Sequence, residues 1–396
     1  MKLELFGKEI INTNPKLKSE IVRTFPDLKT FSLDRDYIIP ADWVQKTSKG
    51  YLFGPDGLFP QELNYLYSKS PLHTSIINFK KLLASGNGYE VIGNELLDGK
   101  SKVGLNQLTN QFDKMLPQIT MDLFIHSRIC IKVTWNTDHT KIIKLDRLAP
   151  EKIRIYDVDE EMMPKEFLYN WDWSNSTKYP TKKYPIYDRL EKDNHCQLFF
   201  YQIETPGMKL YSEPSYVSAL NWITLDSSMS DYHKANITNS LNPSLLIQYF
   251  EKPGTKEEKQ QVLVDLNNSF AGAKKTGRVL VTFSDGKDLA PTITQMEPNK
   301  LDKTFLQLVD TIQRQILYAH QVNPALLGLK TPGSLGGADE IQDGYKLFNA
   351  TIIQPSQLEL ETIMNTFITE NGLTVKLKLR EPNLFDVSKT QTIVTK

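Results

Sequence analysis

The sequence has little cysteine. Cys130 and Cys196 are the two thiols among 396 residues, and both stand in apolar surroundings. So low a count excludes the disulfide scaffold of small secreted domains and is typical of a protein made in a reducing compartment. Because free cysteine is among the most buried residue types, we interpret both thiols as inert core residues.

An excess of charge and long apolar runs are also missing. Lysine and arginine number 47, as do aspartate and glutamate, so the formal net charge is zero. A protein held on nucleic acid by counterion release carries a positive excess, so any contact with DNA must be local or loose. No stretch approaches the roughly twenty apolar residues of a membrane span, and residues 1–12 lack the pattern of a cleaved signal. We expect cytosolic synthesis and no membrane partner.

Catalytic motifs are missing as well. Gly328 and Gly333 have the glycine spacing of a phosphate-binding loop, but Ser334-Leu335 stands where lysine and serine or threonine are required. Residues 157–161 carry four carboxylates without the ligand spacing of a calcium loop, so we interpret them as an acidic turn. The six histidines show neither metal-ligand spacing nor a nucleophile–base pair. We predict no catalytic residue, no metal and no cofactor.

What is present in the first half predicts a mixed α+β arrangement. Apolar residues at helical spacing predict helices near residues 71–85 and 105–124, the second kinked or split at Pro117. A turn at Asn136-Thr137-Asp138 between two β-rich runs predicts a hairpin. The strands expected are 129–135, 141–148, 153–158, 167–173 and 197–203.

Two long helices organise the second half, with a compact segment between them. The first is expected over about residues 212–240, and the second follows Asn299 and ends near His320, which we interpret as a cationic helix cap. The intervening segment has the pattern strand, short helix, strand, at 245–250, 256–270 and 278–283. A further helix, kinked at Pro355, and an edge strand at 374–379 follow.

A glycine-rich loop joins the second long helix to this further helix. Residues 322–328 have the sequence Val-Asn-Pro-Ala-Leu-Leu-Gly, and more glycines follow up to Gly337. Polar backbone needs partners in a core, so such a loop faces water, a ligand or a channel. We interpret it as the lining of a channel, with an ordinary surface loop between helices as the open alternative.

The order of these parts resembles the portal proteins of tailed bacteriophages. The resemblance covers about residues 210–367 and rests on Tyr211-Ser212-Glu213-Pro214, the two helices flanking a small α/β insertion, and the turn and loop of residues 322–337. The chain departs from the family at two points. Ser212 replaces a frequent glycine, and Asn323-Pro324 replaces a frequent proline pair.

The resemblance implies a homo-oligomeric ring at one capsid vertex, with the dodecamer that is usual in the family as the expected number of copies. Through it double-stranded DNA would be packaged and ejected, with contacts to the terminase, the head–tail adaptor and the major capsid protein, in a virion assembled in the host cytoplasm. The portal fold is expected to divide as follows: 1–40 N-terminal arm, 41–211 wing, 212–240 first stem helix region, 241–298 clip, 299–322 second stem helix, 323–337 tunnel loop, 338–367 kinked wing helix, and 368–396 C-terminal strand and reduced crown.

The resemblance also assigns functional residues. Those expected to face DNA in the tunnel loop are Leu329, Lys330, Thr331, Ser334 and Leu335, and the expected hinges are Gly328, Gly333, Gly336 and Gly337. A ring of Lys330 side chains would centre DNA without gripping it. In the clip, Lys274, Lys275 and Arg278 are expected to meet an acidic partner, although simple solvation of a turn explains the same cluster.

Two other functions are kept open. A DNA-packaging or DNA-processing enzyme, either a motor or a nuclease, needs a phosphate loop or convergent carboxylates. A monomeric α+β binding protein would bury the stripes of its long helices against each other.

Overall fold

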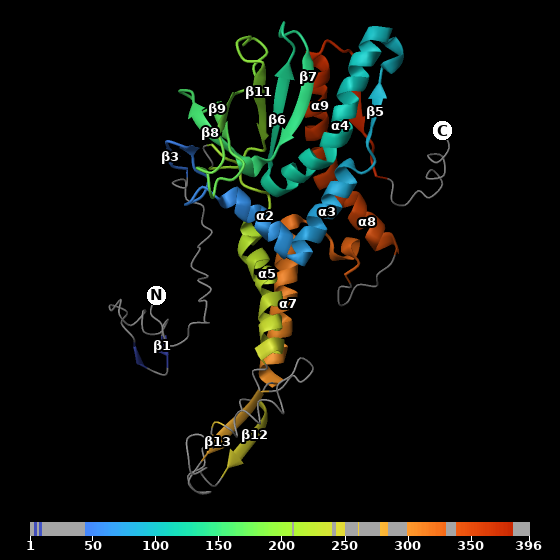
Figure 1. Ribbon diagram of the computed structural model, residues 1–396. Helices are drawn as coiled ribbons and strands as arrows, with labels where there is room; N and C mark the ends of the chain where they lie inside the picture. The colour runs from blue at the N-terminus through green and yellow to red at the C-terminus, as the bar shows by residue number, and fades with distance from the viewer. Residues whose placement is uncertain are drawn as a thin grey trace. The chain divides into compact units, whose positions relative to one another are not determined.

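The computed structural model describes residues 4–5, 8–9, 44–207, 210–239, 243–249, 260, 278–283, 299–329 and 338–382. The chain divides into two compact units, Met1–Ile38 and Ile39–Lys396. In the first, β1 (Glu4–Leu5) pairs antiparallel with β2 (Lys8–Glu9). Most of the predicted N-terminal arm lies outside the described residues. Everything that follows concerns the second unit (Figure 1).

A short hairpin and two successive helices begin the second unit. The hairpin consists of β3 (Lys46–Thr47) and β4 (Gly50–Tyr51), and α2 (Phe59–Lys69) is followed by α3 (Pro71–Ser85). Ser70 separates the two helices because its side chain accepts the His73 N–H and so caps α3, while Pro71 is tolerated in the first turn. The predicted helix at 71–85 is confirmed.

The long helix α4 (Gly99–His126) is continuous. Asp98 caps its start by accepting the Ser101 N–H, and Ser127 ends it in the left-handed conformation, with φ 51°. The expected split at Pro117 is wrong, because the proline lies inside one unbroken helix.

Two antiparallel three-stranded sheets follow. The first has the order β11-β6-β7, with β6 (Arg128–Trp135), β7 (Ile142–Leu148) and β11 (Cys196–Gln202). The second has the order β10-β9-β8, with β8 (Ile153–Val158), β9 (Pro164–Tyr169) and β10 (Lys182–Pro185). The predicted hairpin is confirmed as β6 and β7. Cys130 is buried as expected, but Cys196 is exposed at the start of β11, so the prediction for that thiol is wrong.

The main core lies between the first sheet and two helices that are far apart in sequence. Apolar side chains of α4, β6 and β7 pack with those of α9 (Gln354–Glu370) and β14 (Lys376–Leu379). β14 pairs antiparallel with β5 (Tyr89–Ile92), which confirms the strand predicted at 374–379. Figure 1 shows α9 and α4 beside the β6–β7 end of the sheet.

Two long helices, α5 (Leu220–Asn239) and α7 (Asn299–His320), contact each other. Figure 1 shows them side by side. α5 begins later than expected, because residues 212–216 are not helical and a 3₁₀ turn, η4 (Val217–Ala219), precedes it. Both strands predicted between them exist, as β12 (Pro243–Tyr249) and β13 (Arg278–Phe283), paired in parallel. The predicted helix at 256–270 lies outside the described residues apart from Gln260, which is helical.

None of the helices in the described ranges combines the length and apolar character that crossing a membrane requires.

Candidate functional site

The structure places only part of the predicted site. Gly328 and Leu329 are described, and Arg278 is the first residue of β13. The remaining predicted site residues lie outside the described residues: Lys274, Lys275, Lys330, Thr331, Gly333, Ser334, Leu335, Gly336 and Gly337. The described part of the candidate site consists of the segments on either side of the loop, residues 299–329 and 338–382.

A rigid turn leads from α7 into the loop. η6 (Pro324–Leu327) is capped by Asn323, whose side-chain oxygen accepts the Ala325 N–H at 3.0 Å. Gly328 closes the turn with φ +75°, a left-handed conformation that a residue with a side chain rarely adopts. Leu329 follows with 37% of its surface exposed. The last described residue before the loop is therefore partly exposed to solvent.

Behind this turn lies a helix interrupted by a π turn. α8 (Ala338–Phe348) continues through a π-helical segment, η7 (Asn349–Ile353), into α9. Pro355 follows at once and has no N–H to donate, so the irregularity falls at the predicted kink. At Gly344, an added Cβ would lie 3.0 Å from the Asn323 side-chain nitrogen, so α8 packs closely on the η6 turn.

A buried cluster of rings fastens the end of α7 to α3. His73 Nδ1 and His320 Nε2 are 2.9 Å apart, and Lys80 Nζ lies 3.4 Å from His320 Nδ1. Tyr216 stacks on the His320 imidazole, with ring centroids 5.0 Å apart, and packs tilted against His73, with ring centroids 4.6 Å apart. We call His73, Lys80, Tyr216 and His320 the root cluster, because it lies where α7 ends before the loop.

The two histidines of the root cluster are neutral. Burial, with a smaller contribution from Lys80, lowers the pKa of His73 to about 3, and the same causes hold the pKa of His320 well below its usual range. The Lys80 ammonium has only donors, so His320 accepts at Nδ1 and its Nε2–H donates to His73 Nδ1. His320 is thus no cationic helix cap, and that prediction is wrong.

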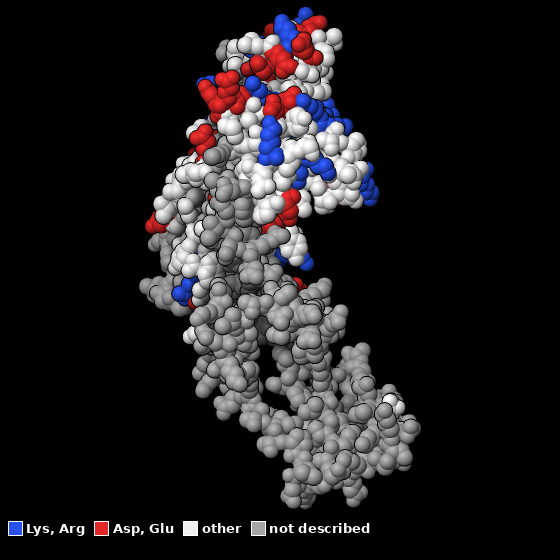
Figure 2. Space-filling model, turned by 90° about the vertical axis from the view of Figure 1, so that its left-hand side faces the viewer, with Lys and Arg blue, Asp and Glu red and all other residues white. Residues whose placement is uncertain are grey.

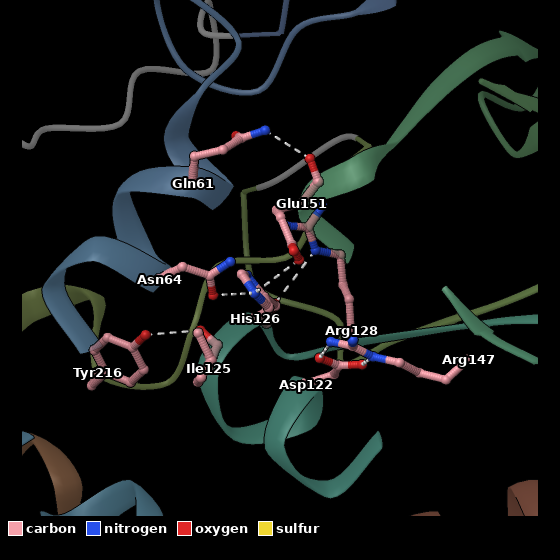
Figure 3. A network of polar contacts seen from close by, with 9 residues as sticks. All are labelled: Gln61, Asn64, Asp122, Ile125, His126, Arg128, Arg147, Glu151 and Tyr216. Atoms are coloured by element: carbon pink, nitrogen blue, oxygen red, sulfur yellow. Dashed lines mark hydrogen bonds and ion pairs between the residues drawn. The ribbon is translucent and has the colours of Figure 1, made fainter. Parts of the chain in front are cut away.

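Two hydrogen bonds extend the root cluster to neighbouring elements. The Tyr216 hydroxyl donates to the Ile125 carbonyl oxygen at 2.8 Å, near the end of α4, as Figure 3 shows. Ser70, the cap of α3, donates to Asp226 Oδ2 of α5 at 2.5 Å. α3 therefore contacts the beginning of α5 through Asp226 and the end of α7 through His320.

A second buried polar network lies next to Ile125 (Figure 3). The Asp122 carboxylate accepts two hydrogen bonds from the Arg147 guanidinium, at 2.5 and 2.6 Å. His126 Nε2 lies 3.0 Å from Asn64 Oδ1 and 3.9 Å from Glu151 Oε2. Burial, helped by two arginines, holds the pKa of His126 well below its usual range. His126 is therefore neutral and donates to Asn64, and it forms no ion pair with Glu151.

No sequence pattern predicted either of these two buried polar groups. His73 and His320 are far apart in the chain, and no spacing rule joins residues from α3, η4 and α7. One local signal existed, namely the Ser70-Pro71 helix start that orients His73 inward. Within the described ranges, no group of three or more histidine, cysteine, aspartate or glutamate side chains is placed to hold a metal ion.

Charges of both signs are mixed on the described surface that Figure 2 shows. Lysine and arginine side chains alternate there with aspartate and glutamate, without a broad region of one sign. The acidic segment at 157–161 contains a turn in which Asp159 Oδ1 accepts the N–H groups of Glu161 and Met163, at 3.0 and 2.7 Å. The predicted acidic turn is confirmed.

Known structures share this fold. A chain in the structure described as "Neck of empty GTA particle computed with C6 symmetry" matches with a TM-score of 0.54 at 13% identity, over 83% of this chain and 85% of that chain. A chain in "Virion of native gene transfer agent (GTA) particle" matches with 0.54 at 13%, over 83% and 84%. One in "Neck of native GTA particle computed with C12 symmetry" matches with 0.53 at 16%, over 83% and 86%.

Comparison with protein-family models finds no match, and comparison with curated proteins finds none either. At 13–16% identity the structural likeness shows the fold alone. The chain therefore has the mixed α+β fold of a protein found in the neck of a gene transfer agent particle.

Proposed function

We propose that the chain is the subunit of a portal ring, which occupies one capsid vertex and conducts double-stranded DNA during packaging and ejection. The observation that carries the proposal is the likeness, over 83% of the chain, to a component of a neck computed with twelvefold symmetry. The paired helices α5 and α7 support it, because they flank a small α/β segment as the resemblance in sequence requires.

Under the same proposal, each segment of the chain corresponds to one part of a portal subunit. Residues 41–211 form the wing, α5 and α7 the stem, 241–298 the clip, and 323–337 the tunnel loop. The clip, with Lys274, Lys275 and Arg278, docks the terminase and then the head–tail adaptor. Neither role requires the subunit to catalyse a reaction.

The root cluster fits this assignment physically. A loop that slides along DNA needs fixed ends, and η6 with its Asn323 cap provides one. The buried rings of His73, Tyr216 and His320 hold the end of α7 against α3, so that the described end of the loop starts from a packed helix. Repetition of the subunit around an axis then makes a ring of Lys330 side chains.

Imaging of the purified chain tests the ring. Negative-stain micrographs are expected to show annular particles with a central hole, and light scattering is expected to give a mass of many subunits. Solitary particles under native conditions would contradict the proposal. ATP turnover or DNA cleavage by the same preparation would instead favour the alternative, a packaging motor or nuclease.

Reversing the charge of the tunnel loop tests the channel. Lys330→Glu is expected to leave ring formation intact and to reduce DNA packaging and retention, because a ring of carboxylates repels phosphates. Packaged DNA per particle is the measurement, with Lys69→Glu at the exposed end of α2 as the control for a charge change elsewhere. Unchanged packaging in the Lys330 variant would remove this residue from the channel.

A further inference from the structure

A cavity of about 410 Å³ lies beside the root cluster. Its walls come from five places in the chain: α3, the end of α4, the segment before α5, the end of α7, and the π turn with the start of α9. The residues that matter for its chemistry are Lys80, Phe124, Glu213, His320, Ile352 and Pro355. A volume of this size is within the range of about 300–1,000 Å³ that small-molecule sites occupy.

Lys80 is a buried cation that has no counter-ion among the described residues. It is 4% exposed, and within the described ranges its ammonium has one hydrogen-bond acceptor, His320 Nδ1 at 3.4 Å, besides the face of Phe124 at 5.9 Å. The ion pairs found among the described residues do not include it. Burial alone lowers the pKa of Lys80, to about 8, so no described carboxylate compensates its charge. An ammonium in this position is costly until an anion joins it.

The rest of the wall is largely apolar. Phe124, Ile352 and Pro355 contribute carbon surface, while Glu213 contributes a carboxylate whose pKa is raised by burial. The ion pairs found among the described residues do not join Glu213 to Lys80. The cavity thus offers one buried cation, Lys80, on a wall that is largely carbon, with the exposed Glu204 and the half-buried Glu213 as its two carboxylates. That combination suits an anion with an apolar body better than a fully hydrated inorganic ion.

We propose that this cavity is a binding site for a carboxylate carried on a short apolar body, with Lys80 as the counter-ion. The carboxylate takes the donors that His320 leaves unused, and the apolar body displaces water from Phe124, Ile352 and Pro355. Because α3, α7 and α9 all contribute to the wall, a bound molecule joins the helices that hold the loop. All the residues that line the cavity belong to one chain, so binding there does not require that the subunits form a ring.

Calorimetric titration with hexanoate tests the site, with hexan-1-ol and inorganic phosphate as matched ligands. Hexanoate is expected to bind, and each of the other two at least about tenfold more weakly, because one lacks the charge and the other the apolar body. Lys80→Met is expected to weaken hexanoate binding by at least about tenfold. Lys81→Met, at the half-buried neighbouring position, is the control and is expected to change nothing. Glu213→Gln is expected to tighten binding, since it removes a like charge.

The pH dependence of hexanoate binding to the unmodified chain provides a second test, which does not require that the Lys80→Met variant folds. Near neutral pH hexanoate is ionised, and its affinity is expected to fall as the pH rises through the Lys80 pKa of about 8, because the neutral amine no longer pairs with the carboxylate. Equal affinity for hexanoate and hexan-1-ol, or an affinity unchanged from about pH 7 to about pH 9.5, would overturn the proposal.

Discussion

Replacing Arg147 with leucine is expected to lower the free energy of unfolding by about 3–5 kcal/mol, the usual cost of removing one partner from a buried ion pair. The Asp122 side chain is only 3% exposed, and both of its oxygens accept hydrogen bonds from the guanidinium. Leucine leaves this carboxyl group buried without a partner. Burial raises the pKa of Asp122 to about 7, so the unpaired group will take up a proton, which limits the loss.

The reverse single change is expected to cost less. Asp122→Leu leaves an arginine whose side chain is already 28% exposed and reaches water by a small rotation. The double variant is expected to recover most of the stability lost in Arg147→Leu, because two apolar side chains replace the pair. Urea unfolding of all four chains gives the coupling energy. Lys144→Leu on the same strand is the control, since its ion pair with Asp146 is exposed and contributes about 0–1 kcal/mol. A loss in Arg147→Leu no larger than in this control would contradict the argument.

Local patterns predicted the elements well wherever local physics decides them. Two β-rich runs and a turn predicted β6 and β7, and the helix start at Ser70-Pro71 was visible because capping is a short-range effect. Prolines predicted the interruptions of helices less reliably. Pro117 sits inside an unbroken helix whose apolar side chains are held in the main core, so packing overrides the missing hydrogen bond. Near Pro355 the chain forms a π turn that absorbs the defect within a helical path.

The root cluster could not be predicted from the sequence, and the reason is physical. Its members come from three elements brought together by the fold, and their charge states depend on burial that only the fold creates. His320 illustrates the point. At a helix end it was expected to be a cation, but it is 1% exposed beside the Lys80 ammonium, and both burial and charge favour the neutral ring. The roles predicted for the loop and clip residues stay predictions, including those of Gly328, Leu329 and Arg278, which the structure describes.

Mild acid is expected to destabilise the second unit through three buried neutral histidines. His73, His126 and His320 have folded-state pKa values below that of an exposed histidine, so the unfolded chain binds more protons once the pH falls below about 6.5. Asp122 acts in the opposite direction, because its raised pKa lets the folded chain bind a proton that the unfolded chain lacks between about pH 4 and pH 7. Near pH 5 the balance is a net uptake of about two protons on unfolding, equivalent to about 2.7 kcal/mol per pH unit.

Urea unfolding at a series of pH values measures how the free energy of unfolding changes with pH. A single substitution isolates the contribution of one histidine to this slope. His126→Gln keeps a side-chain N–H for Asn64 but cannot take up a proton, so it should flatten the slope by about 1.4 kcal/mol per pH unit. Asn106→Gln, an exposed change on the same helix that removes and adds no titratable group, is the control and should leave the slope as it is. Because His126 belongs to the network of Figure 3 and not to the root cluster, the same change should leave hexanoate binding beside Lys80 unaltered. An equal slope in both variants would mean that His126 is protonated in the folded chain, which would restore its ion pair with Glu151 at 3.9 Å and reverse the assignment made from burial.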